Sequence, residues 1–152
     1  MSSETETAAV HRAYVADLPL HTFYELLRLR VDVFVVEQAC PYPELDGRDL
    51  EDSTRHFWLG GDGRSEPVLG YLRLLRESTG EFRIGRVCTA RSVRGRGFGR
   101  QLMQAALAEV GDRTCLLDAQ EHLAGFYREF GFGQVGESYD WDGVAHVPMR
   151  RN

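Results

Sequence analysis

The chain has 152 residues, of which 43% are hydrophobic and 27% charged. This size and composition favour one compact domain and exclude disordered, collagen-like and membrane-spanning proteins. The net charge of -5 argues against general nucleic-acid binding, which needs a basic surface. The start, Met1-Ser2-Ser3-Glu4, lacks the basic stretch of a secretion signal, so we expect a cytoplasmic protein.

All 18 basic residues are arginine. Because a Walker P-loop, a Schiff-base enzyme and a pyridoxal enzyme each need a lysine amine, these three chemistries are excluded. Cys40, Cys88 and Cys115 have neither the paired spacing of a disulfide framework nor a neighbouring set of histidines. We therefore expect reduced thiols and no metal site.

The first elements follow from the apolar spacing. Residues 1–9 are polar and small and are expected to form a flexible tail, which leaves residues 10–152 as a single domain. Arg12–Ala16 is a candidate strand. Apolar residues at spacings of three and four predict an amphipathic helix that runs through Val35, and its stripe consists of Leu20, Phe23, Leu27, Val31 and Phe34.

Residues 38–52 contain two prolines and a glycine, so we expect a long loop after this helix. The only basic residue of this segment is Arg48. Its acidic residues are Glu44, Asp46, Asp49, Glu51 and Asp52. One interpretation is electrostatic attraction of a cationic acceptor such as a polyamine, an amino sugar or a peptide amine. The other is a solvated acidic face, which we favour because acidic loops are common in a chain of this net charge.

Two strands, His56–Leu59 and Val68–Leu75, are predicted on either side of a glycine-rich turn. In the next strand Phe82 and Ile84 alternate but Val87 is out of phase, which predicts a bulge beside Gly85. The remaining elements are a helix Phe98–Val110, a strand Cys115–Leu117, a helix Glu121–Phe130 and a strand Val144–Met149. Hairpins followed by alternating strands and helices predict an α/β (α+β) fold with a mixed sheet.

Residues 93–100 are rich in glycine and arginine and lie between a predicted strand and a predicted helix. The glycines let the backbone approach a ligand closely, and the free amides at a helix N-terminus bind anions. Cations at that end normally cost about 0.3–1 kcal/mol each, yet four arginines gather there: Arg91, Arg94, Arg96 and Arg100. We expect a bound polyanion, with a solvated turn or a nucleic-acid contact as the alternatives.

Arg94, Gly97 and Gly99 fit the pattern R-x-x-G-x-G, which resembles the coenzyme A pyrophosphate loop of the GNAT N-acetyltransferase superfamily. Residues 117–120 and 124–132, with Tyr127-x-x-x-Gly131-Phe132, resemble that family's next strand and helix. Residues 29–47 are similar to its ElaA-like subgroup. The resemblance spans about residues 20–151.

The resemblance implies a mixed, mostly antiparallel central sheet that is splayed at a bulge and flanked by helices. It also implies an acetyl-CoA-dependent N-acetyltransferase, in which a primary amine of a small molecule or peptide attacks the thioester directly. Neither nucleic acid nor a membrane is an expected partner, and the oligomeric state stays open, a homodimer included. The residues expected to bind the cofactor are Val87, Cys88, Thr89, Arg94, Gly95, Arg96, Gly97, Phe98, Gly99 and Gln120. The last of these stands where the family most often has asparagine, so its contact with the cofactor is open.

By resemblance Tyr127 donates a proton to the departing thiolate, although a purely structural core tyrosine is the alternative. Glu37 and His146 are candidates for the general base, His122 is a weaker one, and a bound water could relay the proton to any of them. A coenzyme A-binding module without catalytic activity is the alternative to an enzyme.

Overall fold

The structure is a computed structural model that describes residues 8–152, so residues 1–7 of the predicted tail lie outside the described residues. Its strands are β1 Val10–Tyr14, β2 Arg55–Gly60, β3 Val68–Arg76, β4 Phe82–Thr89, β5 Cys115–Gln120, β6 Gly133–Gln134, β7 Tyr139–Trp141 and β8 Val144–Arg151. Its α-helices are α1 Leu20–Val31, α2 Phe98–Val110 and α3 Ala124–Arg128. A π-helical segment, η2, spans Asp32–Glu37, and short 3-10 turns are η1 Val15–Asp17, η3 Arg48–Leu50, η4 Arg91–Val93 and η5 Glu121–Leu123.

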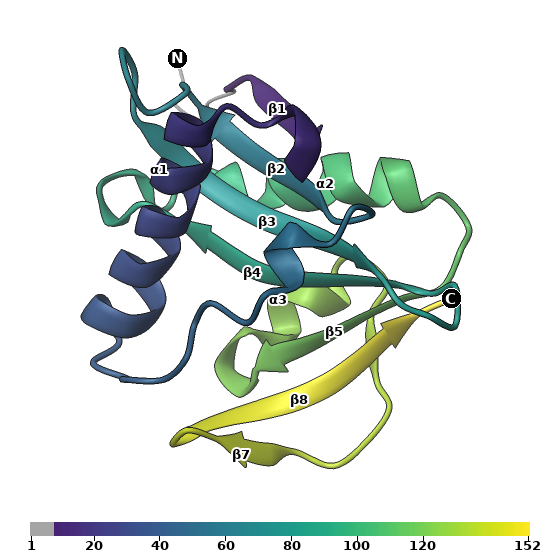
Figure 1. Cartoon of the computed structure of the whole chain (residues 1–152). Helices are drawn as coiled ribbons and strands as arrows, with labels where there is room; N and C mark the ends of the chain where they lie inside the picture. The colour runs from purple at the N-terminus through teal and green to yellow at the C-terminus, as the bar shows by residue number, and fades with distance from the viewer. Residues whose placement is uncertain (1–7) are drawn as a thin grey trace, which may run out of the picture.

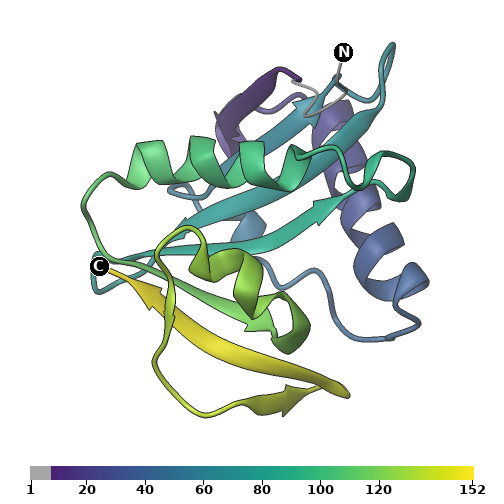
Figure 2. The same cartoon turned by 180° about the vertical axis from the view of Figure 1, so that it is seen from behind.

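The described strands form one eight-stranded sheet in the order β1-β2-β3-β4-β5-β8-β6, with β7 paired to β8. Strands β4 and β5 are parallel, and the other described pairs are antiparallel. Helix α1 covers one face of the sheet, and α2 and α3 cover the other (Figures 1 and 2). This architecture confirms the predicted fold class. No helix of the described residues is long and apolar enough to span a bilayer.

Alternating side chains of the central strands build a separate core on each face of the sheet. Phe57 and Leu72 pack with α2 and α3 on one face, whereas Trp58 and Tyr71 pack with α1 on the other. Helix α2 has the predicted bounds and ends at Gly111, whose φ is +65°. Two buried layers therefore hold the sheet firmly between its helices.

The predicted helix at residue 20 exists, but its predicted buried stripe is wrong. Leu20 is 84% exposed, and the other four residues of that stripe are only partly buried. The face that packs on the sheet instead carries Leu26 and Arg30. Periodicity of apolar residues missed this face because a buried arginine lies in its centre. The helix also continues past Val35, as the π-helical turn η2 that ends at Glu37.

Candidate active site

The bulge in β4 is the first feature that shapes the site. Strand β4 carries one residue more than β3 between the pairs Tyr71–Cys88 and Arg73–Gly85, and the register shifts there. Arg86, in the extra stretch, has a φ of +56°, which is unusual for a residue with a side chain. This confirms the predicted bulge beside Gly85. The extra residue bends β4 away from its next neighbour in the sheet.

Strands β4 and β5 consequently part from each other. They pair at Phe82–Cys115 and Arg83–Leu116, and beyond these positions they share no further register pair in the described residues. A cavity of about 280 Å³ lies where they separate, lined by Gly85 and Val87 of β4 and by residues of β5. The gap between the strands thus opens into a cavity that can hold a ligand.

The cavity has an aromatic end and a charged end. Phe34 of η2, Tyr42 and Trp141 supply the aromatic side chains. Six charged side chains also line it, together with aliphatic ones such as Leu75 and Ile84, and they are Asp46, Arg48, Arg73, Arg83, Arg86 and Asp118. A smaller cavity of about 30 Å³ adjoins the aromatic end and shares Phe34, Tyr42 and Trp141 with it. An occupant can therefore present an apolar part to one end and a polar part to the other.

The glycine-rich loop that precedes α2 has the conformation of an anion site. Gly95 and Gly97 have φ values of +85° and +82°, and nothing lies within 4 Å of the Cβ that a side chain at Gly95 would add. Phe98, at the first position of α2, is 4% exposed and anchors the helix in the core. The open backbone at Gly95 and the N-terminus of α2 leave amides available to a ligand.

The loop arginines make contacts of their own in the structure. Arg94 forms a two-pronged ion pair with Glu37, in which Nη2 donates to Oε1 at 2.8 Å, and it also donates to the carbonyl of Thr89 at 3.0 Å. Arg100 pairs with Glu129 at 2.7 Å. The hydrogen bond from Arg94 lowers the pKa of Glu37. The end of η2 is in this way tied directly to the glycine-rich loop.

Tyr127 reaches the cavity from α3, on the opposite face of the sheet from α1 (Figure 2). It is 7% exposed and packs against Phe126 and Phe132, with ring centroids 5.1 and 6.5 Å away. Burial raises its pKa above the ordinary value for tyrosine. The side chain accordingly belongs to the apolar core and lines the cavity as well, and its hydroxyl stays protonated at neutral pH.

His146 lies on β8 at the aromatic end of the cavity and is 8% exposed. Its ring stacks on Tyr139 with centroids 5.8 Å apart, and Trp141 lies 5.6 Å away. Its Nδ1 is 2.8 Å from the carbonyl of Val144. Because a carbonyl oxygen only accepts, Nδ1 carries the proton, and Nε2 of the neutral ring keeps its lone pair.

Two residues predicted to bind the cofactor have roles of different kinds. Gln120, at the end of β5, lines both cavities, and its Nε2 donates to Oε1 of Gln38 at 3.3 Å. Cys88, on β4, is 6% exposed and packs in the core under α1. Burial raises the pKa of the Cys88 thiol to about 12. It therefore exists as an unreactive thiol at neutral pH, and only its backbone is available to a ligand.

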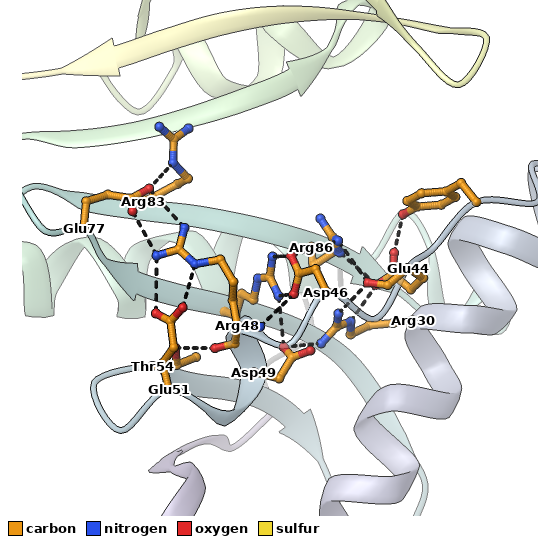
Figure 3. A network of polar contacts seen from close by, with 12 residues as sticks. Arg30, Glu44, Asp46, Arg48, Asp49, Glu51, Thr54, Glu77, Arg83 and Arg86 are labelled. Carbon is orange, nitrogen blue, oxygen red and sulfur yellow. Dashed lines mark hydrogen bonds and ion pairs between the residues drawn. The ribbon is translucent and has the colours of Figure 1, made fainter.

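In the loop of residues 38–52, neither predicted role of the acidic residues holds for the two that are buried. Glu44 and Asp49 are 3% and 4% exposed, so they form neither a solvated face nor a free negative surface. Both accept hydrogen bonds from Arg30, at 2.7 and 2.6 Å, and Arg30 itself is fully buried (Figure 3). The composition of the loop gave no sign of this, because the arginines that pair with it lie on other elements.

Further arginines of the sheet extend the network. Arg73 of β3 donates to Asp46 and to Asp49. Arg86 of the bulge donates to Glu44 at 2.9 Å (Figure 3). Burial alone would raise the pKa of Asp49, but its bonds to the guanidinium groups outweigh burial and hold that pKa below the ordinary value. The loop is thus fixed on the sheet by charge-assisted hydrogen bonds.

Comparison with known proteins identifies the family. The family model described as an acetyltransferase (GNAT) domain matches residues 30–152. The chain belongs to the GNAT acetyltransferase family. A UPF0039 protein of Mycobacterium bovis is 54% identical over 149 residues, which cover 95% of this chain and 94% of that protein. GNAT proteins use an acyl-CoA as cosubstrate, and this assignment confirms the predicted acyltransferase.

Two solved structures agree with this family assignment. An acyl-CoA N-acyltransferase from Pseudomonas aeruginosa has a TM-score of 0.89 and 42% identity, with 96% of this chain and 100% of that chain covered. The structure of Escherichia coli ElaA has a TM-score of 0.85 and 35% identity, with 96% and 100% covered. The protein is an ElaA-like GNAT protein, as the resemblance of residues 29–47 had indicated.

Sequence reasoning missed several residues of this GNAT site. Trp141 comes from the hairpin β7–β8, whose turn residues Asp142 and Gly143 both have positive φ. Asp-Gly between apolar residues is a hairpin signal, so this element could have been found. Arg73 and Asp118 carry no local signal, because only the strand register brings them to the cavity.

Proposed function

We propose that this GNAT protein transfers an acetyl group from acetyl-CoA to the primary amine of a small molecule or peptide, with residues 10–152 as one catalytic domain. The observation that carries the proposal is the cavity where β4 and β5 part. It brings a protonated tyrosine, Tyr127, and a histidine, His146, to one hollow in the sheet. Those are the two proton-transfer groups that acyl transfer to an amine requires.

The pyrophosphate group of coenzyme A fits the glycine-rich loop. Gly95, Gly97 and the first amides of α2 would bind the pyrophosphate, with Arg94 and Arg96 adding positive charge. Phe98 and Gly99 begin the helix that supplies those amides. Acetyl-CoA supplies the activated thioester, and the open edge of β4 at residues 87–89 offers it backbone hydrogen bonds.

Tyr127 is the proposed general acid. Because burial raises its pKa, its hydroxyl carries a proton at neutral pH when the carbon–sulfur bond of the thioester breaks. It then donates that proton to the sulfur, and the sulfur leaves as a thiol. Cys88 does not compete as a nucleophile, since its own thiol is protonated at neutral pH. Its protonation supports direct attack of the amine on the thioester.

We assign the general base to His146 in preference to Glu37. The bond from Nδ1 to the Val144 carbonyl fixes the ring, so that Nε2 can take the proton of the attacking amine. Glu37 is also a weaker base than an ordinary glutamate, because its hydrogen bond from Arg94 lowers its pKa. In this proposal Glu37 positions Arg94 at the cofactor loop.

Replacement of Tyr127 by Phe tests the proposal. We expect kcat to fall by about 10²- to 10⁴-fold, with the dissociation constant of coenzyme A unchanged by calorimetry. Thiol release from acetyl-CoA across a panel of amines measures turnover. The chain has no lysine, so its own side-chain amines cannot contribute to that signal.

A folded wild-type protein that binds coenzyme A but acetylates no amine of a broad panel would contradict the proposal. That result would favour the alternative, a coenzyme A-binding module without catalytic activity. Equal turnover of wild type and Tyr127→Phe would remove the tyrosine from the mechanism and leave the transfer reaction in place.

A further inference from the structure

The charged end of the cavity contains a buried hydrogen-bond donor that the protein leaves without a partner. Arg73 is 3% exposed and lines the cavity. Its two terminal nitrogens donate to Asp46 and Asp49, but the buried Nε has no partner among the described residues. An unpaired buried donor destabilises the folded protein, and more so when the group is charged. A ligand that brings an acceptor oxygen to this nitrogen removes the cost.

The chain also leaves room beside that nitrogen. Gly85 lines the same cavity, and a Cβ added to it would lie 3.8 Å from Nε of Arg73, with no other atom outside its immediate neighbours within 4 Å. The φ of Gly85 is not in the left-handed region, so no backbone strain requires a glycine there. The missing side chain therefore keeps the space next to the donor open.

Hydrogen-bond donors outnumber free acceptors at the charged end of the cavity. Arg83 uses Nε and Nη1 on Glu77 and Asp118, and Arg86 uses Nε and Nη2 on Glu44 and Asp46. This leaves Nη2 of Arg83 and Nη1 of Arg86 without a protein partner among the described residues.

The carboxylates, by contrast, are committed to arginines. Both oxygens of Asp46 accept from Arg73, and Oδ1 of Asp49 accepts from Arg30 and Arg73 together. Four arginines and two aspartates line the cavity, and the further carboxylates that pair with these arginines are Glu44, Asp49, Glu51 and Glu77.

We infer that the acceptor of this enzyme carries a carboxylate in addition to its amine. The carboxylate binds beside Gly85, accepts from Nε of Arg73, and meets the spare nitrogens of Arg83 and Arg86. The amine then extends along the cavity toward Tyr127 and His146. The inference rests on the proposed function for the role of the amine, but the carboxylate site itself is a binding site that can be tested without turnover.

The substrate class is an amino acid or a short peptide with a free carboxylate. A cavity of about 280 Å³ suits a molecule of this size, and its aromatic end accommodates an apolar side chain. A polyamine is disfavoured because its protonated amines offer no acceptor to Nε of Arg73.

The test compares each amino acid with its carboxamide, which has the same shape but no negative charge. Aromatic, aliphatic, acidic and basic amino acids and a dipeptide are titrated by calorimetry into protein saturated with coenzyme A. We expect the best amino acid or dipeptide to bind about tenfold more tightly than its amide, or more, as a charge-assisted hydrogen bond predicts. A preference for the dipeptide over every free amino acid would identify a peptide C-terminus as the source of the carboxylate.

Gly85→Ala is the decisive variant. Its methyl group lies at ordinary contact distance from Nε of Arg73, so the fold tolerates it, but a ligand oxygen loses its place. We expect the preference for carboxylate over carboxamide to fall to less than threefold, with coenzyme A binding unchanged. Arg83→Gln removes one surface donor and should reduce the preference to an intermediate value.

Equal binding of acid and amide across the panel overturns the inference, and so does a preference that survives Gly85→Ala in full. A panel in which nothing binds also overturns it. If the acid is preferred but no thiol is released from acetyl-CoA, the proposed function fails while the carboxylate site stands. If amines without a carboxylate are acetylated best, the proposed function stands and the carboxylate site fails.

Discussion

The buried arginine of α1 should be the most sensitive position for stability. Arg30 is fully buried, and its side chain bonds Glu44 at 2.7 Å and Asp49 at 2.6 Å. Arg30→Met fills a similar space but leaves both carboxylates without this partner. Removing one member of a buried ion pair costs about 3–5 kcal/mol. Because Arg73 and Arg86 still pair with these carboxylates, we expect the lower part of that range.

Urea denaturation and thermal unfolding measure this cost. A loss of about 3 kcal/mol from a total of about 5–15 kcal/mol lowers the melting temperature by about 6–12 °C at this chain length. Arg28→Met is the matched control, since Arg28 lies on the same helix but its side chain is 63% exposed and pairs only with Glu25 at 3.5 Å. We expect the control to change stability by less than about 0.5 kcal/mol.

The pH dependence gives a second test of the same network. The pKa values of Asp46 and Asp49 are held below their ordinary values in the folded protein. A depressed folded pKa adds stability that is present above the unfolded pKa, about 4, and is lost as the pH falls through the folded value. Wild type should therefore lose stability below about pH 4. Arg30→Met, which restores the pKa of Asp49 toward normal, should lose less over the same range.

Two results would refute this reasoning. One is a loss below about 1 kcal/mol for Arg30→Met, which would mean that the burial cost of Arg30 cancels its ion pairs. The other is equal destabilisation by Arg28→Met and Arg30→Met, which would reflect helix propensity and not burial. Adding Asp49→Asn to Arg30→Met should recover part of the loss, because it removes a buried negative charge that has lost one of its two arginine partners.

Three further predictions concern the proposed site. His146→Ala should lower the acetylation rate about 100-fold without weakening the binding of coenzyme A, and added imidazole should restore part of the rate. An unchanged acetylation rate in this variant would exclude His146 as the base. Glu37→Gln should weaken coenzyme A binding about two- to fivefold at low salt, since Arg94 loses the carboxylate that positions it. Unchanged or tighter binding in calorimetry would contradict the positioning role of Glu37. Gly95→Ala should cost about 1 kcal/mol on urea denaturation, because φ is +85° there, and an unchanged midpoint would contradict that expectation.

The elements that could be predicted are those whose burial is decided by apolar residues alone. Helix α2 buries a regular apolar face and stops at a glycine, so its bounds follow from the sequence. The bulge could be found for the same reason, since Val87 breaks an otherwise regular alternation beside Gly85. Local patterns carry enough information wherever the partner of a side chain is simply the apolar core.

Prediction failed where burial depends on a charged partner far along the chain. Arg30 lies 14 residues from Glu44 and 19 from Asp49, and neither its own neighbours nor the net charge of the loop indicates the pairing. The same holds for Arg73, which meets the loop through its place in the sheet. The glycine-rich loop stands out in the sequence because its glycines and arginines are consecutive, whereas the wall of the cavity is assembled from separate strands.

Strands β4 and β5 share only a short seam of hydrogen bonds at Phe82 and Arg83. The sheet thus consists of two leaves, β1–β4 and β5–β8, joined by this seam and by the core under α2 and α3. The free rim of β4 is a template for one more extended chain. A linear molecule with amide groups that binds along this edge would form hydrogen bonds like an added strand. It would thereby stiffen the connection between the two parts of the sheet. Slower amide hydrogen exchange along β4 when such a molecule is bound would record this stiffening.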